Sequence, residues 1–118
     1  MTDYRKYGLV KLDKYALLPQ IHAYDNDTAI DLFALEMRIV FPGSAVYVAS
    51  GYGLKRKSVP AGLQVRYEEI ATIQGLKVRV SLESHTNAIE LLVENDTETH
   101  LTLNRGMVIA RLVFFPLK

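Results

Sequence analysis

The end of the chain most strongly limits what this sequence can fold into. A glycine-containing turn at Arg105 and Gly106 is followed by a long, almost unbroken apolar run that ends at Pro116. A strand that is apolar on both faces is usually a central one, covered on two sides. One charged residue, Arg111, lies in the middle of this run. Because an unpaired buried charge is very costly, Arg111 needs a partner: a carboxylate of the same chain, of a neighbouring subunit, or of a ligand.

The remainder of the sequence is a succession of short segments with a period of two. Apolar and polar residues alternate most clearly over residues 37–41 and 76–82. Turn signals such as Pro42–Gly43 recur about every 8–12 residues, a spacing typical of sandwiches and barrels. Residues 67–71 offer at most one helical turn, and nothing sustains a 3.6-residue period. These patterns predict an all-β fold. The other expected strands cover residues 46–48, 63–71, 89–93, 101–103 and 107–116.

Length and charge exclude several classes of protein. A chain of 118 residues without linker or repeat is expected to form a single domain over residues 1–118. Its 14 basic and 13 acidic residues nearly balance, so there is no strong nucleic-acid signal and no membrane partner is expected. The absence of cysteine excludes disulfides and thiolate metal sites and fits an intracellular protein. Two Asn-x-Thr sequons, at Asn26 and Asn95, are interpreted as turn chemistry.

Few residues suggest chemistry by themselves. The basic run of Lys55, Arg56 and Lys57 is either a solvated loop or a contact for an anion or an acidic partner. Asp31 is unusual because apolar residues flank it, although an outward-facing strand residue would give the same pattern. Glu83 and His85 lie in an expected loop between two strong strands, where charged residues are normally just solvated.

The order of several fragments resembles the homotrimeric dUTPase family over nearly the whole chain. Residues 29–34 are similar to the family's first motif, Ala-Gly-x-Asp-Leu-x-Ala, and residues 105–114 are similar to its fourth, Pro-Gly-Asp-Arg-Ile-Ala-Gln-Leu-Val-Phe. The resemblance implies a dUTPase-like β-clip, a jelly-roll-type barrel, that assembles as a homotrimer. Supporting fragments with family counterparts are Leu18-Pro19, Pro42-Gly43, residues 46–51 and Pro60-Ala61-Gly62.

The parts that carry catalysis in this family match less well. Its members hydrolyse dUTP to dUMP and diphosphate with magnesium, in sites shared by three subunits. Residues 66–75 hold no Arg-Ser pair in place of the second motif, residues 81–87 lack the glycines of the third, and the Gly-rich fifth motif is absent. By resemblance, Glu83 is the candidate base, His85 the candidate replacement for the nucleotide-contacting ring, and Asp31 the remaining first-motif carboxylate and candidate metal residue.

The sequence-based hypothesis is a dUTPase-fold protein that has lost catalysis and serves as a trimeric scaffold for a protein or nucleotide partner. It resembles the dUTPase-derived early-region proteins of adenoviruses, which implies a viral protein in the cytoplasm or nucleus of a host cell. The alternative is a divergent dUTP diphosphatase that uses Asp31 and Glu83 with magnesium; otherwise no cofactor is expected. A third possibility is an oligomeric structural component of a virus or phage.

Arg111 stands where the family keeps a phosphate-contacting glutamine. Either it holds an anion more strongly than glutamine would, or it pairs with a carboxylate such as Asp31 and fills a disused site. The sequence favours the second alternative, because the other phosphate contacts are missing.

Overall fold

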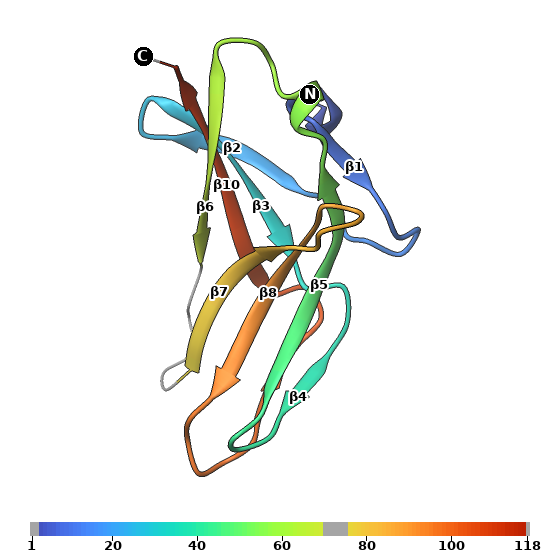
Figure 1. Cartoon of the computed structure of the whole chain (residues 1–118), viewed down its shortest axis with the longest axis vertical. Helices are drawn as coiled ribbons and strands as arrows, with labels where there is room; N and C mark the ends of the chain where they lie inside the picture. Colours follow the sequence, from blue (N-terminus) through green and yellow to red (C-terminus); the bar gives the residue numbers. More distant parts are fainter. Residues whose placement is uncertain (1–2, 70–75, 118) are drawn as a thin grey trace.

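The computed structural model describes residues 3–69 and 76–117, and these residues form an all-β protein (Figure 1). The one-turn helices in the described part are the 3-10 segments η1 (Tyr4–Tyr7) and η2 (Arg56–Ser58). The strands are β1 (Leu9–Lys11), β2 (Gln20–Tyr24), β3 (Asp27–Phe33), β4 (Arg38–Val40), β5 (Ala45–Leu54), β6 (Leu63–Glu69), β7 (Leu76–Leu82), β8 (Ala88–Asn95), β9 (Leu101–Leu103) and β10 (Val108–Pro116).

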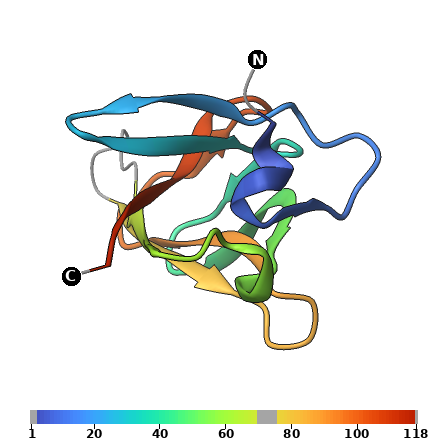
Figure 2. The same ribbon diagram turned by 90° about the horizontal axis from the view of Figure 1, so that it is seen from above.

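The strands form two four-stranded antiparallel sheets and a two-stranded ribbon. One sheet has the order β1-β5-β8-β7, the other β2-β3-β10-β6, and β4 pairs with β9. Seen from above, β2 and β3 lie on one side of the molecule, and β5 and β7 lie on the other (Figure 2). A single apolar cluster includes residues of both sheets, among them Ile30, Leu112, Ile89 and Val93. The predicted all-β architecture is therefore correct.

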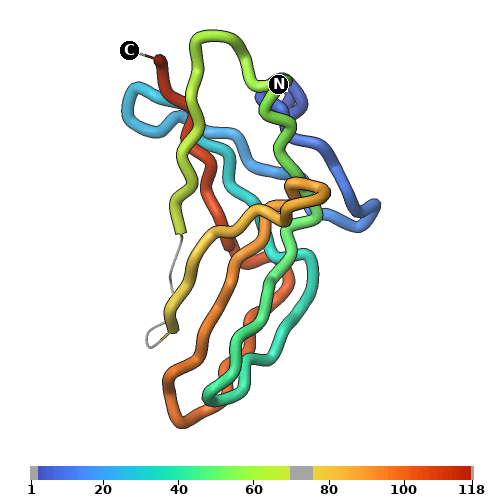
Figure 3. The backbone as a smooth tube through the Cα atoms, in the orientation of Figure 1, coloured from blue at the N-terminus to red at the C-terminus, as the bar shows by residue number. Residues whose placement is uncertain are grey.

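The apolar run at the end of the chain occupies the expected place. β10 lies between β3 and β6 in the sheet, so it is a central strand. Leu112 and Phe114 belong to the core cluster, whereas Val113, which is also fully buried, lies outside that cluster on the other face. The tube in Figure 3 shows β10 ending beside the β2–β3 turn, as the pairing of Phe114 with Thr28 requires.

Some elements were not evident in the sequence. The short strands β1 and β2 were missed, β3 was considered only as one possible setting of Asp31, and the extension of β5 from Gly51 to Leu54 was also missed. Residues 70–71 of the expected 63–71 strand lie outside the described residues, as do residues 70–75 of the region compared with the family's second motif. Asn95 confirms the interpretation of its sequon as turn chemistry, because its side-chain oxygen accepts hydrogen bonds from the Thr97 amide and hydroxyl.

Candidate functional site

The candidate site is a row of polar side chains across the outer face of the β2-β3-β10-β6 sheet. Arg111 is directly opposite Asp31 on β3 and opposite Glu68 on β6, while Asp31 is opposite Gln20 on β2. Side chains directly opposite each other in antiparallel strands point to the same face and lie close enough to interact. The sheet register thus places an arginine between two carboxylates.

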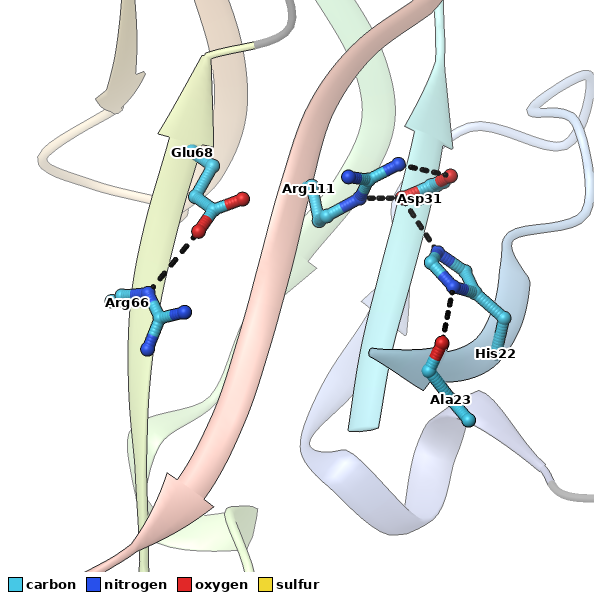
Figure 4. A network of polar contacts seen from close by, with 6 residues as sticks. All are labelled: His22, Ala23, Asp31, Arg66, Glu68 and Arg111. Atoms are coloured by element: carbon cyan, nitrogen blue, oxygen red, sulfur yellow. Dashed lines mark hydrogen bonds and ion pairs between the residues drawn. The ribbon is translucent and has the colours of Figure 1, made fainter. Parts of the chain in front are cut away.

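The Arg111 guanidinium binds the Asp31 carboxylate at two points (Figure 4). Nε donates to Oδ1 at 2.7 Å and Nη2 donates to Oδ2 at 3.3 Å. The guanidinium also lies 5.0 Å from the centre of the Tyr24 ring, within the range of a cation–π contact. The partner required by the buried arginine is therefore a carboxylate of the same chain, and Asp31 is the residue that the sequence favoured.

His22 completes the cluster from β2. Its Nε2 lies 3.2 Å from Asp31 Oδ1, close enough for a charge interaction but not aligned for a hydrogen bond. Its Nδ1 lies 3.1 Å from the Ala23 carbonyl oxygen. Burial pushes the pKa of Asp31 upward, but the hydrogen bonds from Arg111 and the nearby His22 ring outweigh it, so the pKa of this carboxyl is lowered overall. The hydrogen bond to Asp31 in turn raises the pKa of Arg111. Both partners are ionised at neutral pH.

Glu83 and His85 occupy the turn between β7 and β8, on the other sheet from Asp31. Glu83 Oε2 accepts hydrogen bonds from the amides of His85 and Thr86, at 3.0 and 2.8 Å, and from the Thr86 hydroxyl at 2.9 Å. These bonds, the Thr86 amide foremost, lower the pKa of Glu83 to about 2. The His85 side chain is exposed. Within one chain, these two residues are not part of the Arg111 cluster.

The basic run also lies apart from this cluster. Lys55 is the N-cap of η2, and Arg56 and Lys57 lie within this helix; all three side chains are exposed. In residues 3–69 and 76–117, none of the three forms an ion pair.

The described residues do not fit a preformed magnesium site. Within residues 3–69 and 76–117 there is no group of three His, Asp or Glu side chains that could hold a metal ion. The oxygens of Asp31, the candidate metal residue, face Arg111 and His22. Because the Arg111 guanidinium already places a positive charge on this carboxylate, binding of a metal cation there is disfavoured. A single chain therefore offers no assembled set of carboxylate ligands of the kind that Mg²⁺ requires.

Four residues of the polar face were not predicted from the sequence as members of a site: His22, Tyr24, Arg66 and Glu68. His22 and Tyr24 alternate around Ala23, and Arg66 and Glu68 alternate around Tyr67, so each pair shares one face of its strand. Arg66 Nε donates to Glu68 Oε2 at 3.2 Å. This alternation is the sequence signal that could have placed the members of each pair on one face of a strand. However, only the strand register shows that these residues flank the Asp31–Arg111 pair.

Comparison with known sequences identifies the class of protein to which this fold and site belong. The chain is 30% identical over 123 residues to the deoxyuridine 5'-triphosphate nucleotidohydrolase of Clostridium tetani, a match that covers 99% of this chain and 82% of the relative. It is 27% identical to the Corynebacterium glutamicum enzyme of the same name, covering 96% and 78%. The chain belongs to the dUTPase family. No protein-family model matches it.

Solved structures show the same fold at lower sequence identity. The dUTPase of Staphylococcus bacteriophage 80alpha, with dUpNHpp, has a TM-score of 0.69 at 15% identity, covering 93% of this chain and 82% of that one. The dUTPase of phage phi11 of S. aureus has a TM-score of 0.68 at 14% identity, covering 93% and 89%. In the described part of the chain, no helix is long and apolar enough to cross a membrane.

Proposed function

We propose that this chain is a divergent dUTP nucleotidohydrolase that releases dUMP and diphosphate. The observation that carries the proposal is the 30% identity to a deoxyuridine 5'-triphosphate nucleotidohydrolase over 99% of the chain. Because the sites of this family are shared between subunits, one chain supplies only some of the groups around the substrate. We expect a homotrimer, so that the β7–β8 turn of one copy approaches the polar sheet face of another.

In this proposal Arg111 binds a phosphate of the nucleotide. Its guanidinium is charged, half-buried and already held side-on by Asp31, which limits the side-chain entropy lost on binding. Glu83 is the candidate for orienting the attacking water. With a pKa of about 2 it is ionised at neutral pH but is a weak base, so we expect slow turnover. Magnesium would enter with the triphosphate, and the solved phi11 relative is described as coordinating a structural Mg(II) ion.

The test is diphosphate release from dUTP, dCTP and dTTP by the purified protein with magnesium. We expect release from dUTP above that from the other two nucleotides. Glu83→Ala should abolish it, and Arg111→Lys, which keeps the charge but not the fork geometry, should reduce it about tenfold or more. Release that survives Glu83→Ala would remove Glu83 from the proposed role. Equal rates with all three nucleotides would contradict the assignment to dUTP.

One observation favours a second function, a binding scaffold without catalysis. The polar groups that would meet substrate are satisfied within the chain: Asp31 by Arg111, and Glu83 by its own turn. A protein of this kind would bind a protein or nucleotide partner without turnover. Calorimetry with dUTP combined with light scattering distinguishes the two functions. A trimer that does not cleave dUTP, whether or not it binds it, favours the scaffold, and a monodisperse monomer would contradict both trimer-based functions.

A further inference from the structure

One end of the molecule concentrates positive charge that the sequence distributes over two distant segments. η1 carries Arg5 and Lys6, and the segment around η2 carries Lys55, Arg56 and Lys57. The fold joins them, because the Lys55 amide donates to the Gly8 carbonyl at 2.8 Å, one residue beyond η1. η1 and η2 lie side by side in both Figure 1 and Figure 2. We call these five side chains the cationic end.

The charge of this end contrasts with the rest of the chain. Asp3 forms an ion pair with Arg5 at 3.0 Å. When the negative charge of Asp3 is counted with the five basic side chains, the cationic end has a formal charge of +4. The whole chain carries +1, so all other residues together carry −3. The β7–β8 turn is nearby, because the Leu54 amide of β5 donates to the Asn87 carbonyl. This turn brings one negative charge, Glu83, close to the cationic end. Three hydrogen bonds already engage one oxygen of the Glu83 carboxylate. The cationic end is therefore available for an anionic partner.

A cavity of about 480 Å³ adjoins the cationic end. Its lining consists of two short segments of the chain: Asp3, Tyr4 and Arg5 at η1, and Leu18, Pro19, Gln20 and Ile21 at the entry into β2. Leu18 is 68% exposed, so its side chain is accessible to a molecule that enters the cavity. The space is large enough for a bulky apolar side chain, and Arg5 of the cationic end is part of its lining.

Two further features distinguish among anionic partners. Tyr4 packs edge-on against Tyr52, and Tyr7 packs against Phe114, so part of each ring is already covered and less of it is free to stack with bases. β2 is the outermost strand of its sheet, and in the described part of the chain its other edge pairs with no strand. Such an edge can accept an extended polypeptide by strand addition. These features favour a protein segment over a nucleic acid.

We propose that the cationic end and the adjoining cavity form a docking site for an acidic, extended polypeptide segment that carries one bulky apolar side chain. The carboxylates contact the lysines and arginines of η1 and η2, and the apolar side chain enters the cavity beside Leu18. The cavity reaches Gln20, which lies opposite Asp31, but the proposed contacts use neither Asp31 nor Arg111 and do not depend on the hydrolysis of dUTP.

The test is fluorescence anisotropy of the full chain with a labelled synthetic dodecapeptide of Glu and Asp residues around one central Phe. We expect binding that weakens as salt is raised, because added salt shortens the screening length. Replacing the central Phe by Ser in the peptide, or Leu18→Ser in the protein, should weaken binding about tenfold, as expected when the burial of a large apolar side chain is lost. No binding, or equal binding of a peptide with Lys in place of the acids, overturns the proposal.

A matched pair of double variants tests the surface. Lys55→Gln with Arg56→Gln removes two charges from the cationic end, and Lys77→Gln with Arg79→Gln removes the same two residue types from β7. We expect only the first pair to weaken binding, by about tenfold at low salt, since each exposed charge pair makes a modest contribution and two are removed. Equal weakening by both pairs overturns the proposal. Displacement of the peptide by a twelve-nucleotide oligothymidylate at equal concentration also overturns it, in favour of a general polyanion surface.

Discussion

Arg111 and Asp31 face each other directly across β10 and β3, and their side chains join at 2.7 Å between Nε and Oδ1. The pair spans 80 positions of sequence, so it links the first-motif strand to the last strand of the chain. The Asp31 side chain is 9% exposed and that of Arg111 is 22% exposed. Most of the solvation of both charges has therefore been exchanged for their mutual contact.

Removing one member of this pair should destabilise the fold more than removing both. Arg111→Ala leaves Asp31 as an almost buried carboxylate with only His22 nearby, and we expect a loss of about 2 kcal/mol in the free energy of unfolding. The double variant Asp31→Asn with Arg111→Gln removes both charges, so neither is left without its partner, and it should lie within about 1 kcal/mol of the original. Urea denaturation measures both. A double variant less stable than Arg111→Ala would contradict this view of the pair.

Acid should unfold the protein partly through Glu83. Hydrogen bonds in the β7–β8 turn lower the pKa of Glu83 from 4.5 to about 2 in the folded state. A carboxyl with a lowered folded-state pKa contributes stability that is present above the unfolded value and lost as the pH falls toward the folded value. The stability that Glu83 contributes should therefore be lost between about pH 4.5 and pH 2. The pKa of Asp31 is also lowered, so its protonation reduces stability in the same direction.

The variant Glu83→Gln isolates this contribution. It should be less stable than the original at neutral pH, because an amide oxygen accepts hydrogen bonds more weakly than a carboxylate. Its stability should also decline less between pH 4.5 and pH 2. Denaturant midpoints measured at several pH values supply the comparison. Parallel curves for the two proteins would mean that the turn does not depend on the ionised carboxylate.

The sequence predicted the central position of β10 because local composition determines it: a strand apolar on both faces must be covered on both. It also anticipated the pairing of Arg111, because a buried charge requires a partner. The sequence could not place His22, Arg66 and Glu68 around that pair, since their proximity depends on the register of β2 and β6. That register is a property of the whole sheet rather than of any segment.

The cationic end illustrates the same limit at the surface. Lys55, Arg56 and Lys57 were visible as a run, but Arg5 and Lys6 joined them only because η1 packs beside η2. Net charge near zero concealed this asymmetry, because opposite charges on other parts of the chain cancel it. Composition reports the sum of charges, whereas recognition depends on their distribution.

Asn95 should be among the most sensitive polar residues. Its side chain is buried, and its amide nitrogen donates to the carbonyls of Val40 and Thr99, each at 2.9 Å. Asn95→Ala leaves these acceptors and the Thr97 amide without their partner, and we expect a loss of about 2–3 kcal/mol in unfolding free energy. Asn104→Ala, at an exposed position, is the control and should change stability by less than about 0.5 kcal/mol. Thermal or urea unfolding compares the two, and similar effects would contradict the structural role of Asn95.

Two glycines with similar backbone angles should respond very differently to alanine. Gly51 has φ +80° in the irregular part of β5, and an added Cβ would lie 2.5 Å from the Cβ of Ala16. Gly43 has φ +76° in the turn before β5, where an added Cβ would meet nothing within 4 Å. Both substitutions incur the cost of a left-handed conformation, about 1–2 kcal/mol, but only Gly51→Ala adds overpacking of about 1–3 kcal/mol.

The difference between the two variants therefore measures the packing of β5 against the loop that contains Ala16. We expect Gly51→Ala to lose about 2 kcal/mol more unfolding free energy than Gly43→Ala in urea denaturation. The Gly51 carbonyl also accepts the amides of Leu12 and Asp13, at 2.8 and 3.3 Å, so a shift of this backbone disturbs the same loop twice. The double variant Gly51→Ala with Ala16→Gly should recover part of the loss, because it removes the methyl group that the new Cβ meets. Failure of this rescue would indicate that backbone strain alone accounts for the effect.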